Sequence, residues 1–386
     1  MMAYLDNSAT TPLCEAAVRA MTEAMACFGN PSSLHEVGQR SAALLKQSRE
    51  ALGAALGERY LRDGQLIFTG SGTEATALAL QGTAMAKERR EARTVLTTDS
   101  EHPSVENNLR VLEKQGFRIV RVPTRGGALD MDAVRANCNR DLFMVTMMLV
   151  NNETGARYPV EEVFAAARRG NPDCICHCDA VQGFLKLPMT AKSLGADLIT
   201  LSAHKIHGPK GVGALYIAPH ILTKRAIVPF LQGGGQEFGL RSGTENLIGI
   251  AGFAAAAAQG KATVSADVAR MAALSARLIE GLSGSEIGLN LPEKRAPHIV
   301  NITLPQIKSE TMLHYLSGKG ISVSSGSACS SHAKSPSSTL LAFGLSAAEA
   351  DCSLRISLSA QNTEQEVDAL LAALRDGCST LIRIKR

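Results

Sequence analysis

The sequence contains no tryptophan, few aromatic residues and no strong excess of either charge. Aromatic residues account for 4% of the 386 residues, and 40 basic against 36 acidic residues leave a net charge of +4. The charges form no basic block and are not interleaved with aromatic residues. Such a balance gives no electrostatic footprint for a nucleic acid or an anionic membrane. We therefore expect neither partner and predict chemistry on a small molecule.

Long hydrophobic runs are missing as well. The longest apolar run, residues 248–258, is rich in alanine and glycine and falls short of the roughly 20 residues that span a bilayer. We expect this run to form a buried helix. The chain shows no basic-then-apolar secretory start, and its nine cysteines are an odd number. Both features indicate a reduced cytoplasmic protein rather than a disulfide-bonded secreted one.

Short apolar strands alternate with helical patterns over the first two thirds of the chain. This alternation is typical of a mostly parallel sheet that is covered by helices. We predict strands at residues 66–69, 94–98, 118–122, 142–150, 174–178 and 198–202.

Residues that break helices predict where two further boundaries lie. Thr11 followed by Pro12 is typical of an N-cap and a first helical position, so we expect a helix directly after them. Gln259-Gly260-Lys261 separates the alanine-rich run from a second helical pattern near residues 266–282. Strands and helices are mixed beyond that point, so we expect a domain junction near residues 258–265.

Polar residues follow five of the predicted strands. In open α/β sheets the carboxyl ends of the strands form the crevice in which ligands bind. The residues that follow the carboxyl ends of these strands are therefore candidates for one site. They are Gly72, His102, Asn152, Asp179 and Lys205.

Lys205 lies between a short apolar run and a Gly/Pro turn, a poor place for packing. A lysine there can bond an aldehyde cofactor if burial or neighbouring positive charge leaves its amine unprotonated. The alternative is a lysine that caps a turn and points into water, as most lysines do.

The predicted strand at residues 66–69 runs into the glycine turn Gly70-Ser71-Gly72-Thr73-Glu74-Ala75. Residues 76–85 have helix-forming composition, so the turn leads to a helix N-terminus. Unpaired N–H groups and the positive end of the helix dipole make such a junction an anion site. An ordinary βα turn is the alternative, because the run matches neither the dinucleotide motif nor a P-loop. Together with Lys205, Asp179 and His102, an anion site here suits pyridoxal phosphate, a pyridine aldehyde that carries a phosphate.

Several motifs resemble those of the cysteine desulfurases, a pyridoxal-phosphate-dependent family, in order and spacing over nearly the whole chain. The run Ser325-Gly326-Ser327-Ala328-Cys329 is similar to the loop that carries the sulfur-accepting cysteine in the NifS/IscS-like class. The other motifs are Asp6–Thr11, Gly29–Ser33, Glu101-His102, Asn151–Gly155, Asp179–Gln182, Ser202–Lys205 and Arg241–Thr244.

The resemblance implies an α/β fold-type I transferase with two domains. The large domain, residues 13–258, would hold a mostly parallel seven-stranded sheet covered by helices. Residues 1–12 and 259–386 would form a smaller α+β domain with the cysteine loop at about 324–338. It also implies a homodimer.

The same resemblance assigns roles to individual residues. It implies that Lys205 forms a Schiff base with the cofactor and that Asp179 binds the pyridine nitrogen. His102 would stack on the ring and move protons, while Gln182 and Asn152 would contact the ring hydroxyl. The implied phosphate ligands are Gly72, Thr73, Ser202 and His204, with Thr244 reaching the phosphate in the neighbouring subunit. The implied substrate contacts are Asn7, Asn152 and Arg355.

Cys329 lies in a stretch rich in serine, glycine and alanine that lacks apolar periodicity. This composition predicts an exposed loop, in which His332 and Lys334 would lower the thiol pKa and favour the reactive thiolate. A buried small hydrophobe is the alternative for most lone cysteines, including the other eight. The resemblance implies that Cys329 is catalytic. Any contact of Cys329 with a metal cluster would be with a cluster bound by an acceptor protein.

Cys174, Cys176 and Cys178 alternate along a predicted strand. Alternate residues share one face, where cysteine packs as a small apolar residue, whereas zinc motifs place paired cysteines on turns. We predict core packing and no resident metal.

These observations predict an enzyme that removes sulfur from L-cysteine, gives L-alanine and leaves a persulfide on Cys329. The acceptor would be an iron–sulfur scaffold or a thio-modification protein. A selenocysteine lyase, or another enzyme with the class-V aminotransferase fold, would share the cofactor site. A persulfide carrier without enzymatic activity would retain the fold alone.

Overall fold

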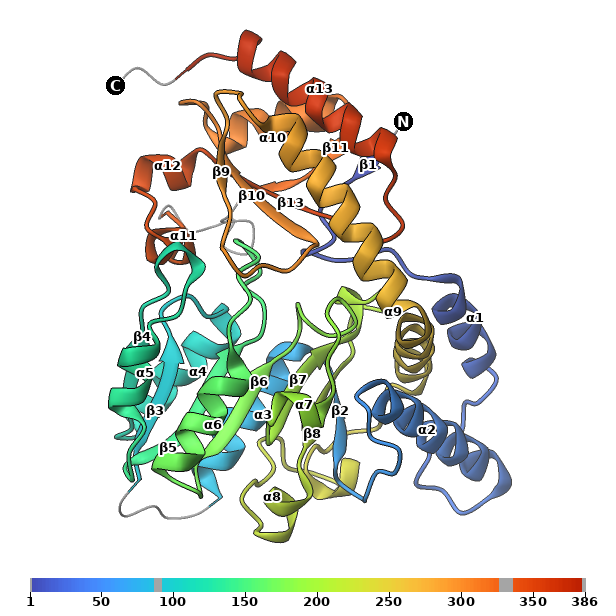
Figure 1. The fold of residues 1–386 in the computed structure, drawn as a ribbon. Coiled ribbons are helices and arrows are strands. Elements are labelled where there is room, and N and C mark those ends of the chain that lie inside the picture. Colours follow the sequence, from blue (N-terminus) through green and yellow to red (C-terminus); the bar gives the residue numbers. More distant parts are fainter. Residues whose placement is uncertain (1, 87–91, 326–335, 384–386) are drawn as a thin grey trace.

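The computed structural model describes residues 2–86, 92–325 and 336–383. Figure 1 shows two regions, each with its own sheet, and a long helix that runs from one region into the other.

The larger region is built on a seven-stranded sheet in the order β2-β8-β7-β6-β5-β3-β4. β8 is antiparallel to both of its neighbours, and the remaining pairs are parallel, so the predicted mostly parallel sheet is confirmed. The strands are β2 (Leu66–Thr69), β3 (Thr94–Thr98), β4 (Arg118–Val122), β5 (Leu142–Met148), β6 (Ile175–Asp179), β7 (Leu198–Ser202) and β8 (Gly213–Ile217).

Helices cover this sheet. α3 packs against β7 and β8, while α6 packs against β5 and β6, and Figure 1 shows α6 in front of the sheet with α3 behind it. The helices of this region are α1 (Glu15–Ala24), α2 (Glu36–Ala55), α3 (Gly72–Met85), α4 (Pro103–Lys114), α5 (Met131–Asn137), α6 (Val160–Gly170), α7 (Ala191–Leu194) and α8 (Pro219–Thr223), with short 3-10 turns η1 (Arg125–Gly127), η2 (Ala203–Lys205) and η3 (Glu237–Gly239).

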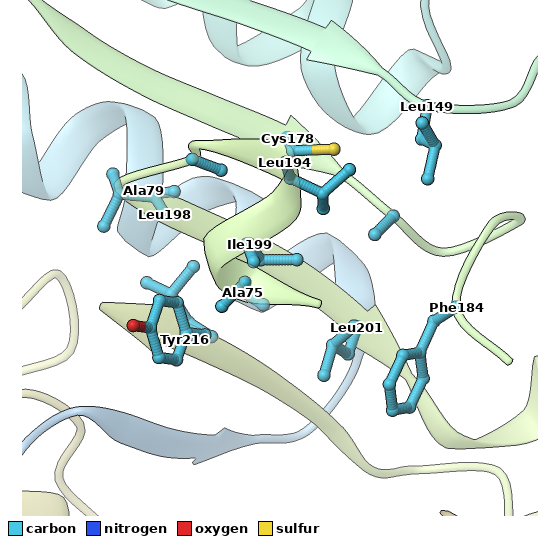
Figure 2. Packing of buried hydrophobic residues seen from close by; sticks show 14 of the residues in the cluster. Ala75, Ala79, Leu149, Cys178, Phe184, Leu194, Leu198, Ile199, Leu201 and Tyr216 are labelled. Atoms are coloured by element: carbon cyan, nitrogen blue, oxygen red, sulfur yellow. The ribbon is translucent and has the colours of Figure 1, made fainter. Parts of the chain in front are cut away.

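The core between sheet and helices consists mainly of small and aliphatic side chains, with some aromatic ones such as Phe184 and Tyr216 (Figure 2). β7 contributes Leu198, Ile199 and Leu201, all fully buried, and Ala75 and Ala79 of α3 pack in the same core. All three cysteines near β6 are buried, and burial raises the pKa of the Cys178 thiol. A thiol that stays protonated and inert, as at Cys178, is what core packing predicts.

The described part of the smaller region contains a four-stranded antiparallel sheet, a parallel pair of short strands and several helices. A second apolar cluster fills it, and Ala3 and Leu5 from the N-terminus belong to that cluster. Its strands are β1 (Ala3–Tyr4), β9 (Gly288–Asn290), β10 (Ile299–Thr303), β11 (Ile321–Ser322), β12 (Ser324–Ser325) and β13 (Ser353–Ser357). Its helices are α10 (Ser309–Gly318), α11 (Ser338–Phe343), α12 (Ala347–Asp351) and α13 (Glu364–Thr380), joined by the C-terminal part of α9 (Leu247–Leu282).

α9 is one continuous helix, so the predicted break at residues 259–261 was wrong. Gly260 faces Leu185, and a Cβ at this glycine would lie 3.0 Å from the Leu185 Cδ1 atom. Close packing therefore explains the glycine, and the helix continues past it. Among the described helices α9 alone is long and apolar enough to span a membrane, but half of its most apolar window is buried inside the protein.

The first helix begins at Glu15, and the predicted start at Thr11-Pro12 was wrong. Thr11 is used differently: its hydroxyl donates to the His204 carbonyl at 3.0 Å and accepts from the His207 N–H at 2.7 Å. The N-terminal segment is thereby fixed against the turn that carries Lys205.

Candidate active site

A cavity of about 280 Å³ opens where the parallel strands of the large sheet end. Its volume is close to the lower limit of typical small-molecule pockets. The structure brings together side chains from all five predicted strand exits and one from the smaller sheet. Residues that line this main pocket include Gly72, Thr73, His102, Asn152, Asp179, Gln182, Ser202, His204, Lys205 and Arg355.

Lys205 ends η2, the turn directly after β7. Its Nζ donates hydrogen bonds to two backbone carbonyls of the N-terminal segment, Ser8 at 2.7 Å and Ala9 at 2.8 Å. The sequence analysis did not identify these partners, because a backbone carbonyl leaves no signal in the residue types. They hold the amine at the wall of the main pocket.

Asp179 is the last residue of β6 and is buried. Burial raises the pKa of its carboxyl group to about 6, opposed by the Val181 N–H and by the charge of Lys205. A buried carboxylate is costly unless a cation or donor compensates it. Asp179 is therefore suited to a ligand that brings a protonated nitrogen.

His102 is the N-cap of α4, and its Nδ1 accepts from the Ser104 N–H at 3.1 Å. Burial, together with the charge of Lys205, lowers the pKa of His102 to about 4. The imidazole is thus neutral near pH 7, and the accepting Nδ1 assigns the proton to Nε2.

The N-terminus of α3 forms an anion cradle beside these residues. Ser71 caps the helix by accepting from the Glu74 N–H at 3.1 Å. A Cβ on Gly72 would lie 3.2 Å from the Ser202 Cβ and 3.3 Å from the Val181 Cγ2, so a side chain there would fill the cradle. Backbone N–H groups and the helix dipole together favour a phosphate at this point.

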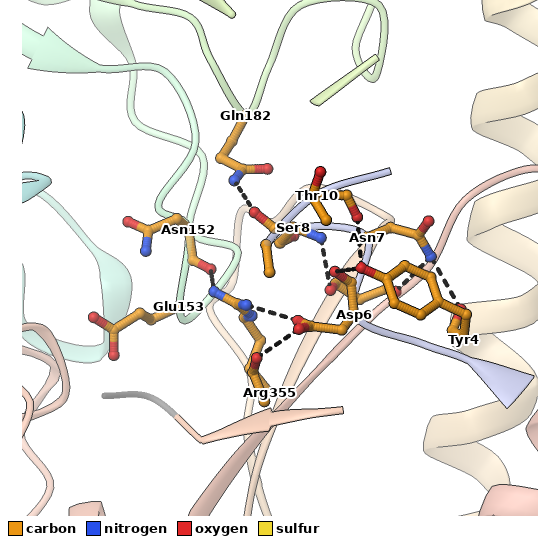
Figure 3. Close-up of polar contacts among 12 residues, drawn as sticks. Tyr4, Asp6, Asn7, Ser8, Thr10, Asn152, Glu153, Gln182 and Arg355 are labelled. Atoms are coloured by element: carbon orange, nitrogen blue, oxygen red, sulfur yellow. Dashed lines mark hydrogen bonds and ion pairs between the residues drawn. The ribbon is translucent and has the colours of Figure 1, made fainter. Parts of the chain in front are cut away.

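Arg355 reaches the main pocket from β13 of the smaller sheet (Figure 3). Its Nη1 donates to the Asn152 carbonyl at 3.0 Å, and its Nη2 donates to the Asp6 carboxylate at 2.8 Å. Within the described residues, the buried Nε has no hydrogen-bond partner. An unmatched buried donor on a guanidinium fits an incoming carboxylate, which guanidinium groups bind through paired hydrogen bonds.

Gln182 also faces this site. Its Nε2 donates to the Ser8 carbonyl at 2.9 Å, as Figure 3 shows. Its Oε1 accepts from the Lys186 Nζ at 3.2 Å. Because a lysine ammonium can only donate, this contact orients the amide with Nε2 toward Ser8.

Two predicted site residues, Asn7 and Thr244, are not among the residues that line the main pocket. Asn7 is buried, and its side-chain amide donates to the Ser357 carbonyl at 3.0 Å and to Asn362 Oδ1 at 3.1 Å, beside a smaller neighbouring cavity. Thr244 is exposed and borders a separate cavity of about 110 Å³. Cys329 lies outside the described residues.

The main pocket suits pyridoxal phosphate, the ligand that the resemblance predicts. The glycine cradle at α3 matches a phosphate, and Asp179 matches a protonated pyridine nitrogen. Lys205 supplies an amine in the same pocket. The unmatched Nε of Arg355 matches the carboxylate of an amino acid.

Comparisons with known proteins identify the family of this chain. The aminotransferase class-V family profile matches residues 3–370. The cysteine desulfurase IscS of Methanosarcina thermophila is 37% identical over 372 residues, which cover 95% of this chain and 90% of that protein. The solved structure of a NifS-like protein has a TM-score of 0.91 at 34% identity and covers 99% of this chain and 100% of its own. The structure of SspA in complex with cysteine has a TM-score of 0.78 at 29% identity, and the match covers 93% of this chain and 99% of SspA. The chain therefore belongs to the pyridoxal-phosphate-dependent aminotransferase class-V family and, within it, to the cysteine desulfurases.

Proposed function

We propose that this protein removes the sulfur atom of L-cysteine, releases L-alanine and carries the sulfur on Cys329 to an acceptor. The observation that carries the proposal is one cavity lined by Lys205, Asp179 and Arg355, whose buried Nε has no hydrogen-bond partner among the described residues. Full-length similarity to cysteine desulfurases supports it, and SspA is a relative whose structure holds cysteine.

Bound pyridoxal phosphate supplies an aldehyde that takes up an amine and a ring that withdraws electrons. In our proposal Lys205 holds that aldehyde in the resting enzyme and afterwards moves protons with its released amine. Asp179 keeps a proton on the ring nitrogen, because its buried carboxylate is stabilised by that charge. His102, neutral near pH 7, packs on the ring and transfers protons through Nε2.

The remaining residues of the main pocket would bind and orient. Gln182 and the Asn152 side chain would contact the ring hydroxyl. Arg355 would bind the substrate carboxylate, since a planar guanidinium offers two parallel hydrogen bonds. The donors proposed for the phosphate are Gly72, Thr73, Ser202 and His204.

Cys329 is proposed to take the sulfur as a thiolate. Its Sγ attacks the sulfur atom of the bound cysteine and forms a sulfur–sulfur bond while the carbon–sulfur bond breaks. The electron pair of the broken bond remains with the carbon skeleton, which takes up a proton and leaves as alanine. The persulfide on Cys329 then carries one sulfur atom to an iron–sulfur scaffold or a thio-modification protein.

We also propose a homodimer in which Thr244 contacts the phosphate bound by the partner subunit. Thr244 lies outside the main pocket of its own chain, and large apolar side chains are exposed at Phe28, Leu34 and Phe238. Burying such side chains in a subunit interface would remove apolar surface from water. Light scattering across a dilution series, with cofactor absorbance recorded in parallel, tests this; a fully active and fully loaded monomer would refute it.

For the domain division we propose residues 13–258 as the large domain and residues 1–12 with 259–386 as the small one, joined through α9. Two separate apolar clusters support this division. We further propose a cytoplasmic location, because an odd number of cysteines, nine in this chain, is typical of a reducing compartment.

Turnover of L-cysteine by two cysteine variants tests the proposed function. Cys329→Ala should abolish alanine formation, whereas Cys378→Ala, a partly exposed cysteine of α13, should retain it. Alanine formation by Cys329→Ala at the parent rate would exclude the proposed sulfur transfer. Selenocysteine turnover that survives in the same variant would favour a selenocysteine lyase. A parent protein that makes no alanine, yet accepts sulfur from a donor, would favour a carrier.

A further inference from the structure

Ser8, in the N-terminal segment, lines the main pocket with a hydroxyl group to which the motifs assign no role. The residue is 1% exposed. Its buried Oγ has no hydrogen-bond partner among residues 2–86, 92–325 and 336–383. Buried hydroxyl groups are nearly always hydrogen-bonded, so each exception calls for an explanation. In a pocket, the explanation we favour is a polar group of the ligand.

The backbone of Ser8 is fixed by hydrogen bonds from three separate segments. Its N–H donates to Ser357 Oγ of β13 at 2.8 Å. Its carbonyl accepts from Lys205 Nζ of η2 at 2.7 Å and from Gln182 Nε2, in the turn after β6, at 2.9 Å. None of these bonds uses the Ser8 side chain. The hydroxyl is therefore attached to a firmly held backbone and is not itself needed to hold it.

These bonds place Ser8 between the two groups that would hold the ends of an amino acid. The Ser8 carbonyl contacts Lys205, whose amine would hold the cofactor aldehyde to which the substrate amine becomes bonded. The Ser8 N–H contacts Ser357, two residues after Arg355 and on the same face of β13, because side chains alternate along a strand. Figure 3 shows Ser8 between Gln182 and Arg355. In an α-amino acid a single carbon joins the amine to the carboxylate, so Ser8 lies where that short span would be.

Arg355 leaves room for a second donor to the same carboxylate. Its Nη1 already donates to the Asn152 carbonyl and its Nη2 to Asp6. Within the described part of the chain, Nε is the guanidinium nitrogen without a partner. A carboxylate has two oxygens, and each accepts hydrogen bonds. The hydroxyl of Ser8 and the Nε of Arg355 are thus two unmatched buried groups in one pocket, and both can donate to it.

We propose that Ser8 is a substrate-binding residue, whose hydroxyl donates a hydrogen bond to the carboxylate of the amino acid that Arg355 binds. This inference rests on the proposed function, in which the main pocket takes an amino acid. It moves the contact that the resemblance implies for Asn7 to the next residue. The Asn7 amide donates to the Ser357 carbonyl and to Asn362, and Asn7 does not line the main pocket.

Ser8→Ala removes the hydroxyl and retains all three backbone hydrogen bonds. Thr97→Val is the matched control, because Thr97 of β3 also has a buried hydroxyl without a partner among the described residues but does not line the main pocket. Removing a hydroxyl that makes no bond in the folded protein breaks nothing. Neither variant should therefore lower the unfolding temperature of the cofactor-free protein.

The measurement titrates L-alanine and ethylamine against the visible absorbance of the bound cofactor in the full-length protein. The two amines differ only in the carboxylate, and neither contains sulfur, so binding is observed without sulfur transfer. We expect Ser8→Ala to weaken the binding of L-alanine about tenfold, as the loss of a hydrogen bond to a charged group predicts. Its affinity for ethylamine, and both affinities of Thr97→Val, should stay within about threefold of the parent values on the same scale.

Three results would overturn the inference alone. The first is parent-like affinity of Ser8→Ala for L-alanine. The second is an equal loss for ethylamine, which would place the hydroxyl at the amine or the cofactor. The third is a lower unfolding temperature in Ser8→Ala but not in Thr97→Val, which would show a structural role. A parent protein that binds L-alanine but forms none from L-cysteine would refute the proposed function and leave the Ser8 contact standing. A parent protein that binds neither amine would refute both.

Discussion

Replacing Arg355 by lysine tests how the main pocket recognises its substrate. Lysine keeps the positive charge but loses the planar fork of donors, including the Nε that has no partner among the described residues. A hydrogen bond to a charged group contributes about 1.5 to 3 kcal/mol, so affinity for L-cysteine should fall roughly ten- to hundredfold. Cysteamine lacks the carboxylate, and its affinity should change by less than about threefold on the same scale.

The assay titrates each amine against the visible absorbance of the bound cofactor in a Cys329→Ala background, where no sulfur can leave. Arg277→Lys is the matched control, because Arg277 is an exposed arginine that pairs with Asp368 and Glu364 and does not line the main pocket. Equal losses for cysteine and cysteamine would show that Arg355 acts through its ion pair with Asp6, and the carboxylate assignment would then be refuted.

Three further predictions concern the pH dependence of stability and the binding of the cofactor. Burial raises the pKa of Glu101 to about 8, so the folded state binds this proton more tightly than the unfolded state. The free energy of unfolding therefore falls as the pH rises from about 5 through 8. Glu101→Gln should remove up to about 4 kcal/mol of that fall. Its unfolding temperature should fall less between pH 5 and 9 than that of the exposed control Glu113→Gln, and parallel curves would contradict the assignment. Gly72→Ala should weaken cofactor affinity about tenfold by crowding the cradle, unlike Gly318→Ala, where a Cβ meets nothing within 4 Å. Thr244→Ala should weaken cofactor retention roughly ten- to hundredfold, seen as faster loss of cofactor on dialysis; full retention would argue against the shared site.

Local sequence patterns predicted much of the large sheet. The apolar runs at residues 66–69, 94–98, 118–122 and 198–202 form strands with those bounds, because each run ends at a glycine or polar cluster. β8 was not predicted, although Gly213–Ile217 is apolar and buried. It pairs antiparallel with both β2 and β7, and such pairing depends on segments far apart in the chain.

The candidate site was predictable where side chains carry the chemistry. The strand exits at His102, Asp179 and Lys205 do converge on one pocket. Contacts made by backbone atoms were not predictable, and the carbonyls of Ser8 and Ala9 that hold Lys205 are the clearest case. Thr11 shows the same limit, since its hydroxyl binds the Lys205 turn instead of capping a helix.

The most direct test of the central claim is the mass of the peptide that contains Cys329 after one turnover with L-cysteine. The account predicts one added sulfur atom on Cys329 for each alanine released, none in Lys205→Ala and none when pyridoxal phosphate is removed. Alanine formed without sulfur on Cys329, or sulfur gained by the Lys205→Ala protein at the parent rate, would contradict it.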